Sequence, residues 1–151
     1  MTDKNLILND AAATEAAGRA LAQQLRLGDV IALSGDLGAG KTSLARGLLA
    51  ELGLEEDAPS PSFALVIPYA PPQLRLPVWH VDLYRLDDAA EAEELGLDDA
   101  LADGALIIEW PERLSWLWPE TLRLHISMPM AGQRRLTATV PPSWTARWPF
   151  P

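Results

Sequence analysis

Apolar positions along the chain recur with two spacings, one typical of helices and one typical of strands. Stretches rich in alanine and leucine repeat at helical spacing and predict helices over residues 11–27 and 41–52. Short apolar runs bounded by turn-forming residues predict strands over residues 30–34, 64–69, 78–84, 105–108, 122–127 and 136–140. Strands that interleave with helices favour an α/β sandwich whose sheet is partly parallel.

The ends of the predicted helices carry recognisable signals. Asn9 or Asp10 can cap the first helix, and the dipeptide 28–29, Gly-Asp, ends it. Gly53 is suited to the C-terminal cap of the second helix. The acidic stretch that follows residue 86 predicts one or two further short helices.

The predicted strand over residues 78–84 alternates strictly between two kinds of side chain. Because successive side chains of a strand point to opposite faces, one face of this strand carries the polar side chains. These are His80, Asp82 and Tyr84. The opposite face is apolar, so this strand brings a carboxylate into a half-buried setting.

Length and composition indicate one globular domain. The chain has 151 residues, of which 48% are hydrophobic, enough for a packed core. We expect a domain over residues 1–140 and a loosely ordered, Pro- and Trp-rich tail over 141–151. There are no cysteines, and this absence excludes disulfides and thiolate metal sites. There are two histidines, His80 and His125. No apolar run is long enough for a membrane span and no export signal is visible, so we expect a cytoplasmic protein.

The charge is −9 and unevenly distributed. Residues 87–103 hold eight acidic residues and no lysine or arginine. Proteins that bind nucleic acid on their own need a basic surface, and the only adjacent cations here are Arg134 and Arg135. Autonomous RNA or DNA binding is therefore not expected.

The loop between the first predicted strand and the second helix carries the strongest motif. Residues 35–42, GDLGAGKT, satisfy G-x-x-x-x-G-K-[ST] at every fixed position. The glycines let backbone N–H groups surround a phosphate, Lys41 can reach the β- and γ-phosphate oxygens, and the Thr42 hydroxyl can bind Mg²⁺. With this motif the expected fold class becomes a P-loop NTPase-like three-layer sandwich with a mixed, partly parallel central sheet. The expected nucleotide contacts are Asp36, Leu37, Gly38, Ala39, Gly40, Lys41, Thr42 and Ser43.

Two carboxylates can complete such a site. Glu109 follows the apolar run 105–108, and Asp82 follows Val81 on the alternating strand. One can hold Mg²⁺ and the other can order the attacking water. The competing interpretations are a surface carboxylate for Glu109 and an ion-pair partner of Arg85 for Asp82.

Other residues near the motif have weaker signals. His80 is more consistent with a buried hydrogen-bonding residue than with a catalytic one. Ser60 and Ser62 lie in a proline-braced loop where NTPases often place a hydroxyl that senses the γ-phosphate. An N-K-x-D motif, which reads guanine, is absent, so adenine is the expected base.

Five motifs in order extend the interpretation beyond the phosphate loop. GDLGAGKT, SPSF, HVDLYRL, ELGL and IEWPE follow one another between residues 35 and 112. Together they resemble the bacterial tRNA threonylcarbamoyladenosine biosynthesis ATPase family, TsaE (formerly YjeE), over about residues 5–140. The resemblance implies an ATP hydrolase, weak alone, that helps install threonylcarbamoyl on adenosine 37 of tRNAs reading codons that begin with A. It implies action through a TsaB–TsaD partner complex.

The resemblance also implies roles for individual residues. Thr42 and Glu109 would hold Mg²⁺, Asp82 would be the catalytic carboxylate beside Lys41, and Arg134 would contact the nucleotide. Trp110 resembles a family site residue whose role the sequence leaves open. Ser62 stands where the family usually has threonine, which keeps the hydroxyl and loses the methyl group.

A different enzyme class also uses this loop. A small P-loop kinase would phosphorylate a metabolite with ATP. Such kinases usually cover the donor phosphates with a lid that carries arginine, and residues 87–103 have none. The sequence therefore favours the ATPase over the kinase.

Overall fold

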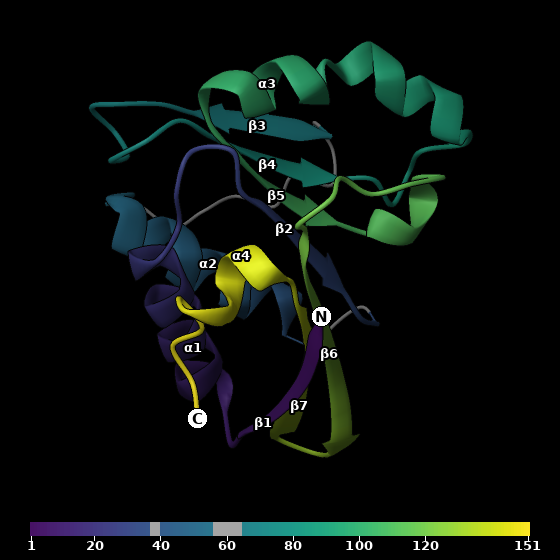
Figure 1. The fold of residues 1–151 in the computed structure, drawn as a ribbon. Coiled ribbons are helices and arrows are strands. Elements are labelled where there is room, and N and C mark those ends of the chain that lie inside the picture. Colours follow the sequence, from purple (N-terminus) through teal and green to yellow (C-terminus); the bar gives the residue numbers. More distant parts are fainter. Residues whose placement is uncertain (37–39, 56–64) are drawn as a thin grey trace.

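The computed structural model describes residues 1–36, 40–55 and 65–151. A seven-stranded sheet runs in the order β1-β7-β6-β2-β5-β4-β3 (Figure 1). Its strands are β1 (Thr2–Leu8), β2 (Val30–Ser34), β3 (Val66–Tyr69), β4 (Val78–Asp82), β5 (Ala105–Glu109), β6 (Leu122–Met130) and β7 (Gln133–Val140). The central strands β6, β2, β5 and β4 pair in parallel, and the outer pairs are antiparallel. The sheet is thus mixed and partly parallel, as predicted.

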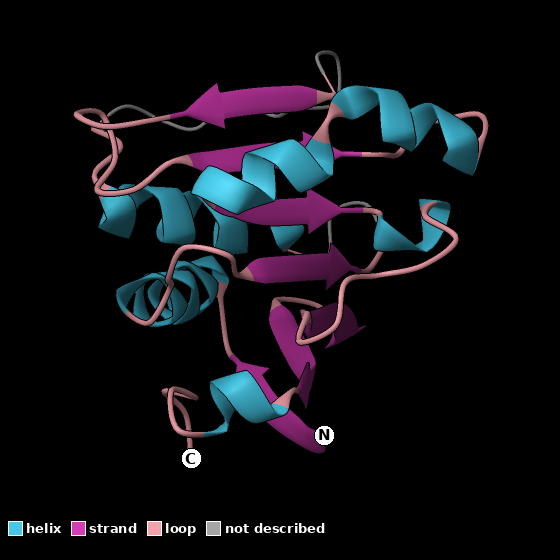
Figure 2. Cartoon of the chain, turned by 45° about the horizontal axis from the view of Figure 1, so that its top comes forward, coloured by secondary structure: helices cyan, strands magenta, loops and turns pink. Residues whose placement is uncertain are grey.

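Helices lie on both faces of this sheet (Figure 2). They are α1 (Ala11–Gln23), α2 (Lys41–Leu52), η1 (Ala89–Leu95), α3 (Leu97–Asp103), η2 (Pro111–Arg113) and α4 (Pro142–Thr145). The helices α1 and α2 pack together on one face, where Ile31 and Ile107 enter a large apolar core. On the other face Val30, Leu106 and Ile108 join a second core with η1 and α3. Two cores separated by one sheet give the predicted three-layer sandwich.

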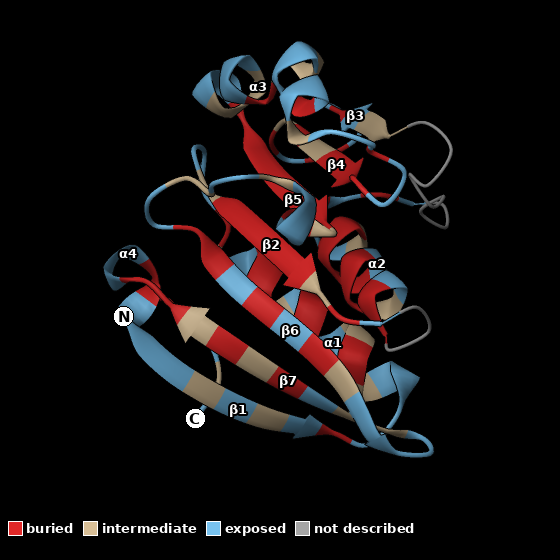
Figure 3. Cartoon of the chain, turned by 90° about the vertical axis from the view of Figure 1, so that its right-hand side faces the viewer, coloured by how far each residue is buried: buried red, intermediate tan, exposed pale blue. Residues whose placement is uncertain are grey.

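The central strands are buried on both faces, which explains their continuous apolar sequences. All five residues of β5 are buried, whereas β1 at the edge of the sheet is mostly exposed or half-buried (Figure 3). Residues of odd number on β5 face α2, and those of even number face α3. This parity decides which side chains can meet the phosphate loop.

Several elements differ from the sequence prediction. Strand β6 continues to Met130 and β7 begins at Gln133, so each is three residues longer than predicted. The first helix ends at Gln23 rather than at residue 27, because Arg26 N–H donates to the Asp29 carboxylate and Gly28 has φ 89°. Strand β4 ends at Asp82, before Leu83 and Tyr84. Strand β1 has no counterpart among the predicted strands, and it pairs along its whole length with β7.

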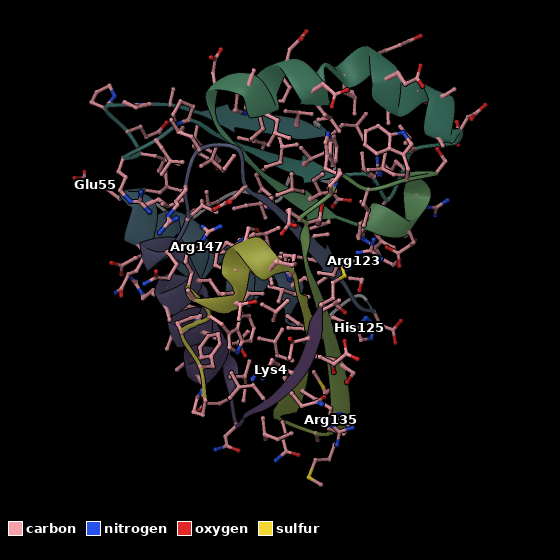
Figure 4. All side chains as sticks on the ribbon, viewed as in Figure 1. Lys4, Glu55, Arg123, His125, Arg135 and Arg147 are labelled. Atoms are coloured by element: carbon pink, nitrogen blue, oxygen red, sulfur yellow. The ribbon has the colours of Figure 1, made fainter. Side chains whose placement is uncertain are left out.

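The tail also differs from the expected loose segment. Its Trp144 is completely buried in the core beneath α1 and α2. Arg147 (Figure 4) is 7% exposed and pairs with Asp29, with Nη1 at 2.7 Å from Oδ2. The same guanidinium donates to the Gln24 carbonyl at 2.8 Å and stacks 4.2 Å from the Trp144 ring centroid. These contacts join residues 144–147 to the end of α1.

Within the described ranges, no helix is both long enough and apolar enough to cross a bilayer.

Candidate functional site

The phosphate loop connects β2 to α2 at the edge of the sheet where the parallel strands end. Gly35 and Gly40 have φ values of 138° and 112°, which side chains with a Cβ rarely adopt. Gly40 caps α2, and its carbonyl accepts a hydrogen bond from Leu44 N–H at 3.0 Å. A Cβ on Gly40 would meet Arg134 Nε at 3.0 Å. The helix therefore begins where a compact backbone can approach a phosphate closely.

Lys41, the first residue of α2, is buried beside the aromatic ring of Trp110. Its side chain is 5% exposed, and Nζ makes no hydrogen bond within the described structure. The ammonium lies 3.8 Å from the centroid of the Trp110 ring. Burial lowers the pKa of Lys41 below its ordinary value of 10.5, and the carboxylates of Glu109 and Asp82 oppose that shift. A buried cation that has no acceptor in the described part of the chain is suited to receive an anionic ligand.

Asp82 and Glu109 are neighbours on adjacent strands, both facing α2. The two residues are register partners in the parallel pair β4–β5, and they are 4% and 6% exposed. Neighbouring strands lie about 4.8 Å apart, so both carboxylates share one edge of the sheet with Lys41. This burial contradicts the interpretation of Glu109 as a surface carboxylate.

A buried histidine holds Glu109. His80 Nε2 lies 2.7 Å from Glu109 Oε2, and because a carboxylate only accepts, Nε2 carries the proton and donates. His80 is 3% exposed, and its Nδ1 makes no hydrogen bond in the described structure. The preference for a buried hydrogen-bonding role of His80 is confirmed, and its partner is the carboxylate of the candidate metal ligand. Asp82 is held too, since Oδ1 accepts from Tyr84 N–H at 2.9 Å.

Trp110 has an unusual backbone conformation for a bulky residue. Its φ of 61° and ψ of 49° lie in the left-handed region, which costs a non-glycine residue of order 1 kcal/mol or more. The ring packs against Tyr84 at a centroid distance of 4.9 Å, with the two ring planes tilted by 47°, and it faces the Lys41 ammonium. The sequence leaves the role of Trp110 open, and the structure shows that its ring packs against the buried Lys41 side chain.

The remaining predicted residues divide into two groups. Asp36 and Thr42 are exposed at the mouth of the site, Ser43 is half-buried, and Arg134 lies against Gly40. The predictions for Leu37, Gly38, Ala39, Ser60 and Ser62 fall outside the described residues. The predicted residues that are described thus gather around the start of α2 and the ends of β4 and β5.

The donor set fits Mg²⁺ bound together with a polyphosphate. Mg²⁺ usually takes one or two protein oxygens, with phosphates and water completing its shell. Thr42 and Glu109 offer a hydroxyl and a carboxylate of this kind. In residues 1–36, 40–55 and 65–151 no three or more His, Asp or Glu side chains are grouped to enclose a metal alone. The residues therefore suit a metal carried in with a nucleotide.

Sequence reasoning missed the bond between His80 and Glu109 and the contact between Trp110 and Lys41. The hydrogen bond links β4 to β5. Its two residues are 29 positions apart in the sequence, and no local sequence pattern indicates how two parallel strands align. The contact between Trp110 and Lys41 depends on the left-handed backbone conformation of Trp110, and no local sequence pattern indicates that conformation. The alternation of β4 was the one available signal, because it placed His80 and Asp82 on the same face.

Comparisons with known proteins identify the family of this chain. The family profile of "Threonylcarbamoyl adenosine biosynthesis protein TsaE" matches residues 8–136. A Streptomyces coelicolor protein named "tRNA threonylcarbamoyladenosine biosynthesis protein TsaE" is 46% identical over 113 residues, covering 72% of this chain and 75% of its own. A Bacillus subtilis protein of the same name is 36% identical over 129 residues, covering 83% and 78%.

A solved structure shares the whole fold. The crystal structure of YdiB from Bacillus subtilis superposes with a TM-score of 0.78 at 26% sequence identity, covering 97% of this chain and 91% of the other. The superposition covers a larger share of this chain than the family profile does. Profile, relatives and structure agree, and the chain belongs to the TsaE family.

Proposed function

We propose that this protein binds Mg-ATP at the start of α2, hydrolyses it, and serves the threonylcarbamoyl modification of adenosine 37 in tRNA. The observation that supports ATP binding most directly is the Lys41 ammonium, which is buried and has no hydrogen-bond acceptor among residues 1–36, 40–55 and 65–151. A phosphate oxygen would supply the acceptor. The N-terminus of α2 adds backbone N–H groups and a positive helix dipole at the same point.

Other residues of the site would bind Mg²⁺ and activate the attacking water. Thr42 and Glu109 would hold Mg²⁺, which neutralises phosphate charge when bound. His80 orients Glu109 by donating to Oε2. Asp82, held by the Tyr84 backbone N–H, would accept the proton of the attacking water. Arg134, beside Gly40, would contact the nucleotide.

The modification step requires a partner. The chain has a net charge of −9, and its only adjacent cations in sequence are Arg134 and Arg135, so we propose that it acts through a TsaB–TsaD-type complex rather than by binding tRNA on its own. Nucleotide occupancy would then control assembly with that complex. A pull-down from the native cell with ATP, ADP and a non-hydrolysable analogue tests this step, and retention of the same partners without any nucleotide would contradict it.

Replacing Lys41 by alanine tests the nucleotide site. A charge-assisted hydrogen bond contributes about 1.5–3 kcal/mol, so loss of the lysine should weaken Mg-ATP binding at least about tenfold in calorimetry. The matched control is Lys4→Ala, because Lys4 is the other lysine of the chain and lies on β1 at the far edge of the sheet (Figure 4). Equal affinity of Lys41→Ala and wild type would refute the site.

Replacing Asp82 by asparagine separates binding from hydrolysis. The amide keeps the shape and can still accept from Tyr84 N–H, but it cannot take up a proton. We expect Mg-ATP affinity close to that of wild type and hydrolysis reduced by about 10²-fold or more. Unchanged turnover would remove Asp82 from catalysis and leave the binding site intact.

A further inference from the structure

A second recess lies on the other side of the sheet from Lys41. Residues of η1 and α3 line one side of it, and residues 114–116 and 118, between η2 and β6, line the other. The recess has a volume of about 520 Å³, within the range of ligand-binding pockets. We call it the acidic groove. Its lining contains neither lysine nor arginine.

Two tryptophans make the aromatic wall of the acidic groove. Trp118 is half-buried against the second core, and its indole Nε1–H donates to Asp98 Oδ1 at 2.6 Å. Trp116 packs edge-on against Trp118 at a centroid distance of 5.0 Å. It is nevertheless 53% exposed, so much of its ring faces solvent. This hydrogen bond links the two tryptophans to α3, which carries Asp98.

Carboxylates line the opposite wall. Glu93, Asp98 and Asp99 all line the groove and are exposed. They belong to residues 87–103, which hold eight acidic residues and no cation. An indole face with carboxylates around it favours a cation, through the ring quadrupole and through direct pairing.

We propose that the acidic groove binds an arginine side chain presented by a basic segment of a partner protein. A guanidinium is planar, so it can stack on the exposed Trp116 ring while its N–H groups pair with a carboxylate. Lysine offers a point charge and lacks the flat surface. Tryptophan and arginine are also the residues that most often dominate protein interfaces. The groove lies outside the nucleotide site, so this inference does not depend on ATP binding.

A pair of blocked five-residue peptides tests the proposal. One carries two arginines, and the other carries citrulline at both positions, which keeps the shape and removes the charge. Added to the whole ¹⁵N-labelled protein, the arginine peptide should shift the indole N–H signals of Trp116 and Trp118 saturably in nuclear magnetic resonance spectra. The citrulline peptide should shift neither signal.

Substitutions locate the contact. Asp99→Asn should weaken the arginine peptide about fivefold and Trp116→Ala about tenfold. The matched control is Asp103→Asn, which removes the same charge from the end of α3 outside the groove. It should bind the peptide as wild type does. All three variants should keep the wild-type affinity for Mg-ATP.

Several results would overturn the proposal. Equal weakening by Asp99→Asn and Asp103→Asn would mean that only the diffuse negative field attracts the peptide. Binding of the citrulline peptide, or no shift of either indole signal, would also reject an arginine site. A further contrary outcome is that the wild-type protein self-associates in sedimentation experiments and binds no peptide. If Trp116→Ala then abolished the self-association, the groove would be assigned to a second copy of this chain.

Discussion

Trp144 provides the sharpest test of how the end of the chain is held. It is the largest completely buried side chain, and it lies in the core shared by α1 and α2. Truncating a buried tryptophan to alanine costs about 3–5 kcal/mol, because both the transfer energy and the packing around the cavity are lost. The variant also loses the stacking of Arg147 at 4.2 Å. We therefore expect Trp144→Ala to lower the free energy of unfolding by about 3–5 kcal/mol.

This loss is large compared with the stability of a domain, which is about 5–15 kcal/mol. In a protein of this size it corresponds to a fall in Tm of roughly 6–20 °C. Guanidinium unfolding followed by circular dichroism measures the free energy, and calorimetry measures Tm. The measurement separates a docked tail from a loosely attached one.

Two further variants make the test specific. Trp116→Ala removes the same side chain from an exposed position and should change stability by at most about 1 kcal/mol. Trp144→Phe keeps most of the packing and removes an indole N–H that has no hydrogen-bond partner in the described structure. These effects oppose each other, so Trp144→Phe should stay within about 1 kcal/mol of wild type. A change below about 1 kcal/mol for Trp144→Ala would refute this account of the tail.

Three other outcomes follow from the packing and charges. Gly47→Ala should destabilise by about 2 kcal/mol or more in denaturant unfolding, because its Cβ would collide with the Glu15 carbonyl of α1; a neutral effect would show that the helices can separate freely. His80→Phe removes the donor to Glu109 and should weaken Mg²⁺-dependent nucleotide binding about 10–100-fold; an equal loss without Mg²⁺ would contradict a positioning role. The pKa of Lys41 lies below 10.5 in the fold, so the unfolded chain binds more protons between the two values. Wild type should therefore gain stability relative to Lys41→Met as pH rises through that window, and a constant difference would exclude the shift.

The central part of the fold could be predicted from sequence because its signals are local. The strand over residues 30–34 is a short apolar run, and the phosphate loop follows it with every fixed position filled. The boundaries of β2 and α2 agree with the prediction. Here sequence period, turn residues and motif all indicate the same structure.

The two ends of the chain could not be predicted in the same way. Strand β1 lies at the sheet edge, and its residues Asp3, Lys4 and Asn5 do not show the apolar run of a buried strand. Its strand state depends on pairing with β7, from Thr2 opposite Val140 onward. In the tail, four prolines near two tryptophans suggest an open segment, whereas burial of Trp144 depends on a space that α1 and the sheet create together.

The candidate site shows the same division. The positions of Lys41, Asp82 and Glu109 follow from motifs and from strand parity. The bond from His80 to Glu109 and the stacking of Trp110 on Lys41 require the register of β4 on β5 and a left-handed backbone. Sequence patterns indicate which residues are polar or apolar, and tertiary contacts decide which of them meet.

The strand order has a consequence for synthesis of the protein on the ribosome. Strand β2, which leads into the phosphate loop, lies between β5 and β6, and both are translated much later. Strand β1 can pair only after β7 has been translated, and β7 is the last strand of this sheet in sequence order. A nascent chain that stops before β5 has the loop sequence but neither Glu109 nor the sheet that supports the loop. The proposed nucleotide site can therefore form only after β5 and β6 have been translated.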